Sequence, residues 1–195
     1  MKIIALLESK YEESGKIPFI PTLAYPDSVM VRSGNPVFLP EFDSSFRAIF
    51  YLGVKISRLG KSIAERFASR YYSQVAPVMV AFPSELVNEL GSRGLPWTGA
   101  ACFDRSVIVG DFRDYADLCE RGNFRIAFSH LPEECAALPS EKEIGMAIQE
   151  VSRNNALKMG DLILVPLQCK SLTLHPDTFL NVCSGDEVLL KTAIK

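Results

Sequence analysis

The sequence predicts a sheet-dominated α+β protein with a few helices. Residues 1–43 contain short apolar stretches that are broken repeatedly by proline and glycine, a pattern typical of short strands and turns. The run from Arg47 to Ser57 is long, β-branched and aromatic, which predicts a central strand. Helical periodicity is confined to a few later segments, so strands should dominate the fold.

Two of the predicted helices begin with a serine followed three residues later by a glutamate, the spacing of a capping box. Ser62 and Glu65 predict a helix from Ile63 to Tyr72. Ser140 and Glu143 predict a second helix, and a shorter one is expected over 84–90, closed by a glycine near position 91 or 94. The apolar stripe of the second helix consists of Ile144, Ala147, Ile148 and Val151.

Further strands are predicted over 76–82, 162–165, 172–174 and 188–194. The sequence contains no internal repeat, low-complexity segment or interdomain linker. A chain of 195 residues is long enough for one sizeable core, so residues 1–195 are expected to form a single domain.

Composition argues against several partners and compartments. Lysine and arginine number 21 against 23 acidic residues, and the net charge of -2 gives no general attraction to nucleic acid or anionic lipid. The apolar stretch after Lys2 is too short for a signal peptide. No run approaches the roughly 20 apolar residues of a membrane helix, so we expect a cytoplasmic protein without a membrane partner.

The five cysteines, an odd number, are scattered without CxxC spacing, which favours reduced structural thiols over a zinc site. A nucleophilic cysteine would need a histidine partner. The two histidines, His130 and His175, have no local motif around them, and a triad is recognised only in space.

Several segments, in order along nearly the whole chain, resemble the small single-domain enzymes of the fumarylacetoacetate hydrolase (FAH) superfamily. The resemblance implies a mixed β-sandwich roll with a few peripheral helices that is usually dimeric. The segments are 26–28 (PDS), 35–40 (NPVFLP), 56–72 (ISRLGKSIAERFASRYY), 93–97 (RGLPW), 103–110 around its Phe-Asp pair, 157–162 (LKMGDL) and 185–190.

Active members of that superfamily hold Mg²⁺ or another divalent cation with a Glu-x-Glu pair on one strand and an aspartate on another. Counting without a gap from the matching segments, the glutamate positions fall on Ile49 and Tyr51, and the aspartate position falls on Val80. Magnesium prefers oxygen ligands in octahedral geometry, which apolar side chains cannot supply. The resemblance therefore implies a degenerate site with no metal cofactor.

Three other active-site elements of the family also differ. A family lysine that polarises the substrate falls on Ala101, and the histidine of a lid element falls on Glu13 within the segment SKYEE. The family's Gly-Thr-Pro turn is replaced by 164–168, LVPLQ. Tyr25, Asp104 and Gln168 are the candidates for residual pocket residues.

An alignment shift along a strand would move the assigned positions to the other face. No small shift restores a carboxylate, because neither 47–57 nor 71–84 contains an acidic residue. A new metal site elsewhere stays open as an alternative, although its acids are more typical of turns, helix caps and surface charges. The acids in question are Asp43, Glu85, Asp104 and Asp111.

Three functions follow from the resemblance. The first is a pseudoenzyme that retains the fold for ligand binding or assembly, as a homodimer or as a heteromer with an active paralogue. The second is a hydrolase, isomerase or decarboxylase acting on a small keto-acid or acyl-pyruvate through a rearranged or metal-free site. The third is a purely structural protein with a filled cleft.

Overall fold

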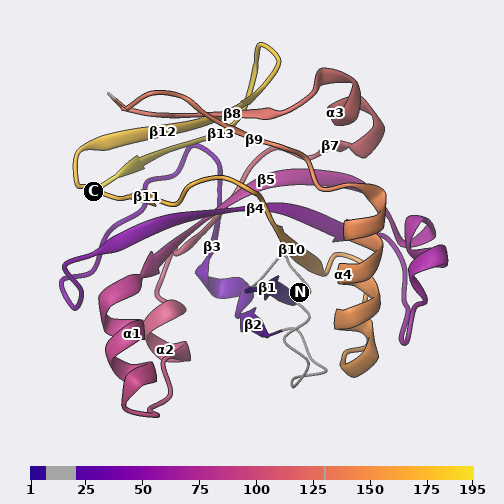
Figure 1. Cartoon of the computed structure of the whole chain (residues 1–195), viewed down its shortest axis with the longest axis horizontal. Coiled ribbons are helices and arrows are strands. Elements are labelled where there is room, and N and C mark those ends of the chain that lie inside the picture. Colours follow the sequence, from indigo (N-terminus) through magenta and orange to yellow (C-terminus); the bar gives the residue numbers. More distant parts are fainter. Residues whose placement is uncertain (8–20, 130) are drawn as a thin grey trace.

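The computed structural model describes residues 1–7, 21–129 and 131–195 and shows two packed sheets with a few helices around them (Figure 1). In these ranges the larger, mixed sheet has nine strands, ordered β2-β1-β10-β4-β5-β6-β3, with β11 paired to β4 and β7 to β5. Its strands are β1 (Ile3–Leu6), β2 (Thr22–Tyr25), β3 (Met30–Arg32), β4 (Phe46–Ile56), β5 (Tyr72–Pro83), β6 (Val107–Val109), β7 (Arg113–Asp114), β10 (Leu162–Pro166) and β11 (Leu172–Thr173).

The smaller sheet has the order β13-β12-β8-β9. It packs over one side of β4 and β5, while the first two α-helices lie on the other side (Figure 1). Its strands are β8 (Phe124–Phe128), β9 (Glu134–Ala136), β12 (Thr178–Ser184) and β13 (Glu187–Ile194). The helices are α1 (Ser84–Ser92), α2 (Thr98–Ala101), α3 (Tyr115–Arg121) and α4 (Glu141–Asn154), with 3₁₀ turns η1 (Asp27–Val29) and η2 (Glu65–Tyr71). The sheet-dominated α+β class is thus confirmed.

The predicted central strand is confirmed as β4, which lies between β10 and β5 in the larger sheet. Along β4 the side chains alternate between two cores, because successive residues of a strand point to opposite faces. Phe46, Ala48, Phe50 and Leu52 pack into the core between the two sheets. The intervening residues face the side of the sheet that carries α1 and α2.

Helix α4 begins where the capping box predicted. The Ser140 side chain accepts a hydrogen bond from the Glu143 amide, and the Glu143 carboxylate accepts one from the Ser140 amide. The predicted apolar stripe is buried in the core between the sheets. Both the cap and the stripe of this helix are therefore confirmed.

The α-helix predicted from Ile63 to Tyr72 is wrong, because this segment is the 3₁₀ turn η2 and has no side-chain cap. Ser62 adopts a positive φ of 52°, which is incompatible with the extended backbone of an N-cap residue. The amides nearby are satisfied from α4 instead. Ile63 donates to the Ser152 hydroxyl at 2.9 Å, and Glu65 donates to the Gln149 side-chain oxygen at 3.0 Å.

The remaining predicted elements differ from the observed ones mainly in length. The strand predicted over 76–82 is part of the longer β5, and α1, β10, β11 and β13 lie at their predicted places. Some elements were not predicted, because they are short or carry polar residues in alternation: β6, β7, β8, β9, β12, α2 and α3. Among the described residues, no helix has the length and apolar character needed to cross a membrane.

Candidate functional site

One face of β4 carries every second residue from Arg47 through Ile49, Tyr51 and Gly53 to Lys55. This face looks toward α1 and α2 and away from the smaller sheet. None of its residues is acidic, and the charged residues at its two ends are both cations. A catalytic metal of the family type would need carboxylates here.

The positions that the resemblance assigned to metal ligands lie together. Ile49 is the direct partner of Val80 across the antiparallel strands β4 and β5, and Tyr51 is paired with Val78 in the same register. Residues paired in this way project from the same face of a sheet. Val80 is fully buried, Tyr51 is 3% exposed and Ile49 is half-buried.

Ala101, the position assigned to the family lysine, is fully buried at the end of α2 and belongs to the same apolar cluster. Tyr25 comes from β2 into this cluster and is 3% exposed. The structure therefore brings five of the predicted positions together: Tyr25, Ile49, Tyr51, Val80 and Ala101.

The other predicted positions lie elsewhere. Asp104 is on an exposed turn, with its carboxylate 4.0 Å from Arg105 Nε. Gln168 is exposed after β10, and its backbone bridges to Ala137 beside β9. Glu13 lies outside the described residues, as does His130.

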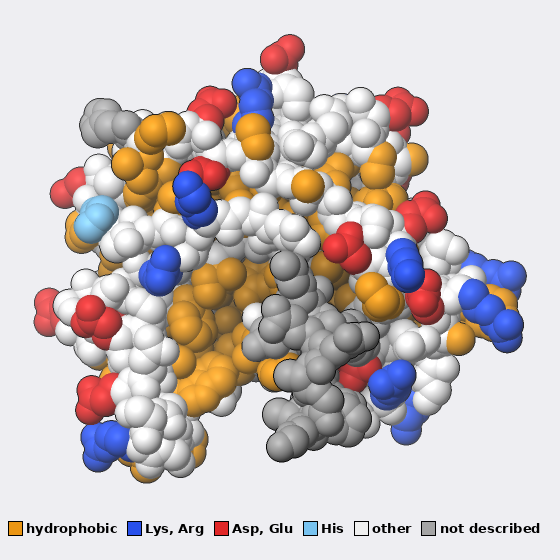
Figure 2. All heavy atoms as spheres, viewed as in Figure 1, with side chains coloured by type: hydrophobic (Ala, Val, Ile, Leu, Met, Phe, Trp, Pro, Cys, Tyr) orange, Lys and Arg blue, Asp and Glu red, His pale blue; other side chains and the backbone are white. Residues whose placement is uncertain are grey.

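Hydrophobic side chains line a hollow beneath β4 and β5 and beside α1 and α2 (Figure 2). These are the elements that carry Ile49, Val80 and Ala101. Phe82 and Trp97 pack edge to face at the border of this cluster, with ring centroids 6.3 Å apart. This face is thus apolar, and the side chains of Val80 and Ala101 in its cluster are closed to solvent.

Three weakly acidic groups lie near one another on this face. Burial raises the pKa of the Tyr51 phenol to about 12. The pKa of Tyr25 is also raised, first by burial and then by the neighbouring Tyr51 phenol and Cys102 thiol. Burial likewise raises the pKa of Cys102. All three groups therefore stay protonated and neutral near pH 7, and in this state they can donate hydrogen bonds.

Cys102 is the residue of this group that sequence reasoning missed. It follows α2, and its Sγ lies 4.0 Å from the Ala24 carbonyl oxygen on β2. All five cysteines are free. No local signal marks this thiol in the sequence, because its proximity to Tyr25 arises only when the residue after α2 comes to lie beside β2.

The side chains at Ile49, Tyr51 and Val80 do not fit a divalent cation. Two are hydrocarbon, and the third offers only a neutral phenol. A hard cation needs several oxygen ligands with negative charge among them. Within residues 1–7, 21–129 and 131–195, no three histidine, cysteine, aspartate or glutamate side chains lie together in a way that could hold a metal ion.

Two of the acids considered for a relocated metal site have structural partners instead. The Asp43 carboxylate accepts hydrogen bonds from the amides of Ser45 and Leu86, each at 3.0 Å. Glu85 accepts a hydrogen bond from the Ser44 hydroxyl at 2.8 Å. These contacts join the start of β4 to the first turn of α1.

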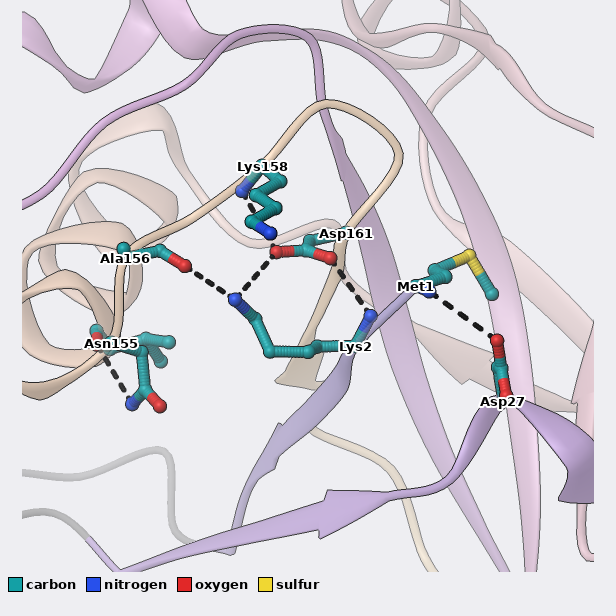
Figure 3. Close-up of polar contacts among 8 residues, drawn as sticks. Met1, Lys2, Asp27, Asn155, Ala156, Lys158 and Asp161 are labelled. Atoms are coloured by element: carbon teal, nitrogen blue, oxygen red, sulfur yellow. Dashed lines mark hydrogen bonds and ion pairs between the residues drawn. The ribbon is translucent and has the colours of Figure 1, made fainter.

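The strand β1, whose Ile3 and Ala5 line this face, is fixed by the buried carboxylate of Asp161 (Figure 3). The Lys2 amide donates to Asp161 Oδ1 at 2.8 Å, and Lys2 Nζ lies 3.1 Å from Oδ2. The Lys158 amide also donates to Oδ2, at 2.8 Å. Burial opposes ionisation of Asp161, but these hydrogen bonds and the Lys2 ammonium outweigh it and lower the pKa.

No family model matches the chain. The sequence is 27% identical over 142 residues to the mitochondrial oxaloacetate tautomerase FAHD1 of Rattus norvegicus. The match covers 71% of this chain and 64% of that protein, so it spans less than two thirds of the length of this curated relative.

Solved structures extend the similarity over the whole fold. A protein of Yersinia pestis CO92 assigned to the fumarylacetoacetate hydrolase family superposes with a TM-score of 0.81 at 18% identity, covering 100% of this chain and 92% of that one. The fumarylpyruvate hydrolase of Pseudomonas aeruginosa, solved with Mn²⁺ and pyruvate, superposes with a TM-score of 0.76 at 14% identity, covering 99% and 88%. The fold of this chain is therefore the fold of these proteins.

Proposed function

We infer that this chain, which has the fold of the FAH superfamily, is a member of that superfamily whose metal site has been replaced by apolar packing. It is a pseudoenzyme that retains the fold for binding or assembly. One observation carries the proposal: Ile49 faces Val80 across β4 and β5, with Tyr51 beside them, in a buried cluster. Three ligands of one cation would have to converge in this manner, yet none of these side chains is a carboxylate.

The surrounding electrostatics also disfavour a cation. Arg47 lies on the same face, two residues before Ile49, and its guanidinium is the charged group at that end of the strand. Tyr51 keeps its proton because burial raises its pKa to about 12. A divalent ion placed beside Ile49, Tyr51 and Val80 would meet hydrocarbon and a neutral phenol, and it would lose its hydration without compensation.

Loss of the carboxylates is compatible with a stable fold. Acidic side chains gathered around an empty metal site repel one another, and apolar replacements remove that repulsion. Val80 and Ala101 are fully buried and so contribute to the core.

A second candidate function is a metal-free enzyme of the same superfamily acting on a small keto-acid or acyl-pyruvate. The observation that favours it is the group of three neutral donors, Tyr25, Tyr51 and Cys102. Neutral phenols can donate hydrogen bonds to a carbonyl oxygen as negative charge develops on it. The related proteins include a tautomerase and a hydrolase by name.

Calorimetric titration with Mg²⁺ and Mn²⁺, beside assays of oxaloacetate tautomerisation, oxaloacetate decarboxylation and acyl-pyruvate hydrolysis, tests both candidates. The pseudoenzyme predicts no saturable metal binding and no turnover. Metal-dependent turnover by the wild type would overturn it. Turnover without metal that is abolished in Tyr25→Phe or Tyr51→Phe, but not in Tyr72→Phe, would favour the second candidate. Tyr72 is a suitable control because it is a buried tyrosine in the core on the other side of the sheet.

Assembly is part of the proposal. A homodimer, or a heteromer with an active paralogue, would give a catalytically inactive chain a structural role. Light scattering on the purified protein should give twice the monomer mass of 21.6 kDa. A monomeric mass for the protein alone, with a stable complex when it is mixed with an active paralogue, would favour the heteromer.

A further inference from the structure

A separate cavity of about 350 Å³ lies at the other end of the same face. Its lining includes Lys55 from β4, Leu162 from β10 and Met30 from β3, together with Val109 and Phe112. The apolar side chains form its walls, and a cavity of this size is at the lower end of those that bind small molecules.

Packing at the centre of the face separates this cavity from the Ile49–Val80 site. Gly53 lies between Tyr51 and Lys55 on this face, and the space above it is filled by neighbours. A Cβ placed on Gly53 would lie 2.7 Å from Val78 Cγ2 and 3.3 Å from Leu162 Cδ1. Packed side chains therefore lie between the two ends of the face, and the cavity lining contains neither Ile49 nor Val80.

Two cations border the cavity without a carboxylate partner among the described residues. Lys55 Nζ donates to the Gln74 side-chain oxygen at 3.2 Å and lies 5.0 Å from the centre of the Phe112 ring. Arg32 is exposed on β3 and forms no ion pair in these ranges. A lysine held against an aromatic ring and a neutral amide keeps its full charge available to a ligand.

One acid, Asp111, also lines the cavity and is exposed. Its amide donates to the Leu189 carbonyl oxygen at 2.7 Å, which fixes the backbone at the border between the two sheets. The lining side chains Arg32, Lys55 and Asp111 together carry one net positive charge. The Met1 ammonium, which also borders the cavity, is neutralised by an ion pair with Asp27 at 3.3 Å. The net charge therefore complements a monoanion better than a dianion.

We propose that this cavity binds a small organic monocarboxylate with a hydrocarbon or aromatic body. The carboxylate pairs with Lys55 and Arg32, and the apolar body contacts Met30, Val109 and Leu162. Burial of the apolar body stabilises the complex, and the charge pair selects the acid over a neutral analogue.

Octanoate and octan-1-ol are matched probes, because they share the chain and differ in the charged group. Calorimetric titration of the full chain should show saturable binding of octanoate. The double variant Arg32→Gln with Lys55→Gln should weaken octanoate binding at least tenfold and leave octan-1-ol binding within twofold. Asp111→Asn should tighten octanoate binding. The charge-matched control, Arg66→Gln with Lys142→Gln, removes two exposed cations elsewhere on the protein. It should change neither octanoate binding nor octan-1-ol binding.

Substitutions that fill space with a larger side chain test where octanoate binds without changing any charge. Met30→Trp places bulk at a half-buried lining position and should abolish octanoate binding, whereas Ile49→Trp places it beside Val80 and should not. Urea denaturation of each variant verifies its folding. No saturable octanoate binding by the wild type, or equal binding by the Arg32/Lys55 double variant, would overturn the proposal. Loss of octanoate binding in Ile49→Trp but not in Met30→Trp would also overturn the proposal, because it would locate the binding site beside Val80. None of these results bears on metal binding at Ile49 and Val80.

Discussion

Ile49 and Val80 lie directly opposite each other across the antiparallel strands β4 and β5. They are separated by thirty intervening residues of sequence, yet they form one cross-strand pair on the apolar face of the larger sheet. A substitution at one of these positions therefore changes the immediate surroundings of the other. This pair is where the proposed loss of the metal site can be reversed and measured.

A single acidic substitution at this pair should destabilise the protein. Val80→Asp places a carboxylate at a fully buried position without a partner. We expect a loss of roughly 2–5 kcal/mol in the free energy of unfolding at pH 7, and a raised pKa for the new carboxyl group. Urea denaturation checks this, with Val80→Ala as the control for lost volume alone. If Val80→Asp is no less stable than Val80→Ala, the position is not closed to solvent.

The combined variant Ile49→Glu, Tyr51→Glu, Val80→Asp should recover Mn²⁺ binding before any activity. Mn²⁺ should stabilise this variant in urea denaturation, since a ligand that binds only the folded state adds stability by mass action. Mn²⁺ should not stabilise the three single variants, because one carboxylate supplies too few ligands for the cation. Ala101 still lacks the family lysine, so turnover should stay absent. Absence of Mn²⁺ binding in the triple variant would mean that these positions do not correspond to the metal site of the relatives.

Asp161→Asn should destabilise the junction of β1 and β10. The variant loses the ion pair with Lys2 and weakens the acceptor for the amides of Lys2 and Lys158. The expected loss at pH 7 is roughly 1–3 kcal/mol. Asp27→Asn is the control, because the Asp27 side chain is 59% exposed and its carboxylate forms a surface ion pair with the Met1 amino group.

The effect of Asp161 should depend on pH in a defined direction. Its pKa in the folded state is lowered, so its stabilisation is fully present above the unfolded pKa of about 3.9 and is lost as the pH falls through the folded value. The difference in unfolding free energy between wild type and Asp161→Asn should therefore be constant from pH 6 to 8 and shrink below pH 4. A difference that grows on acidification contradicts the assignment.

Glu187 joins elements of both sheets and should give a second acid-sensitive contact. Its carboxylate accepts hydrogen bonds from Arg113 on β7 and from Arg121 on α3. These two arginines lower the pKa of Glu187 to about 2. Glu187→Gln should lower the melting temperature at pH 7, with the difference from wild type vanishing as the pH falls from about 4.3 toward 2. Glu133→Gln is the matched control, because its exposed carboxylate lies 3.9 Å from Arg125.

The two capping-box sequences should respond differently to alanine. Ser140→Ala removes a formed cap of α4 and should destabilise the protein by roughly 0.5–2 kcal/mol. Ser62→Ala should have less than half that effect, because Ser62 forms no cap and its backbone φ is 52°. Chemical denaturation of both variants measures the difference. Equal losses would contradict the capping geometry at Ser62.

The sequence by itself determined the strand β4, the cap and buried stripe of α4, and the sheet-dominated class. These features depend on local patterns: a β-branched run alternates between two faces, and Ser140 and Glu143 are close enough along the chain to cap one helix start. The absence of acidic residues from 47–57 and 71–84 is also a property of the sequence alone.

Only the tertiary structure decided the rest. Ser62 and Glu65 have the same spacing as Ser140 and Glu143, but side chains of α4 bind the amides of 63 and 65 and hold this segment in a 3₁₀ turn. The pairing of Ile49 with Val80, the approach of Cys102 to Tyr25 and the cavity beside Lys55 all join residues from different strands and helices. Such contacts depend on strand order and register, which are set by packing of the whole sheet and not by any local stretch of sequence.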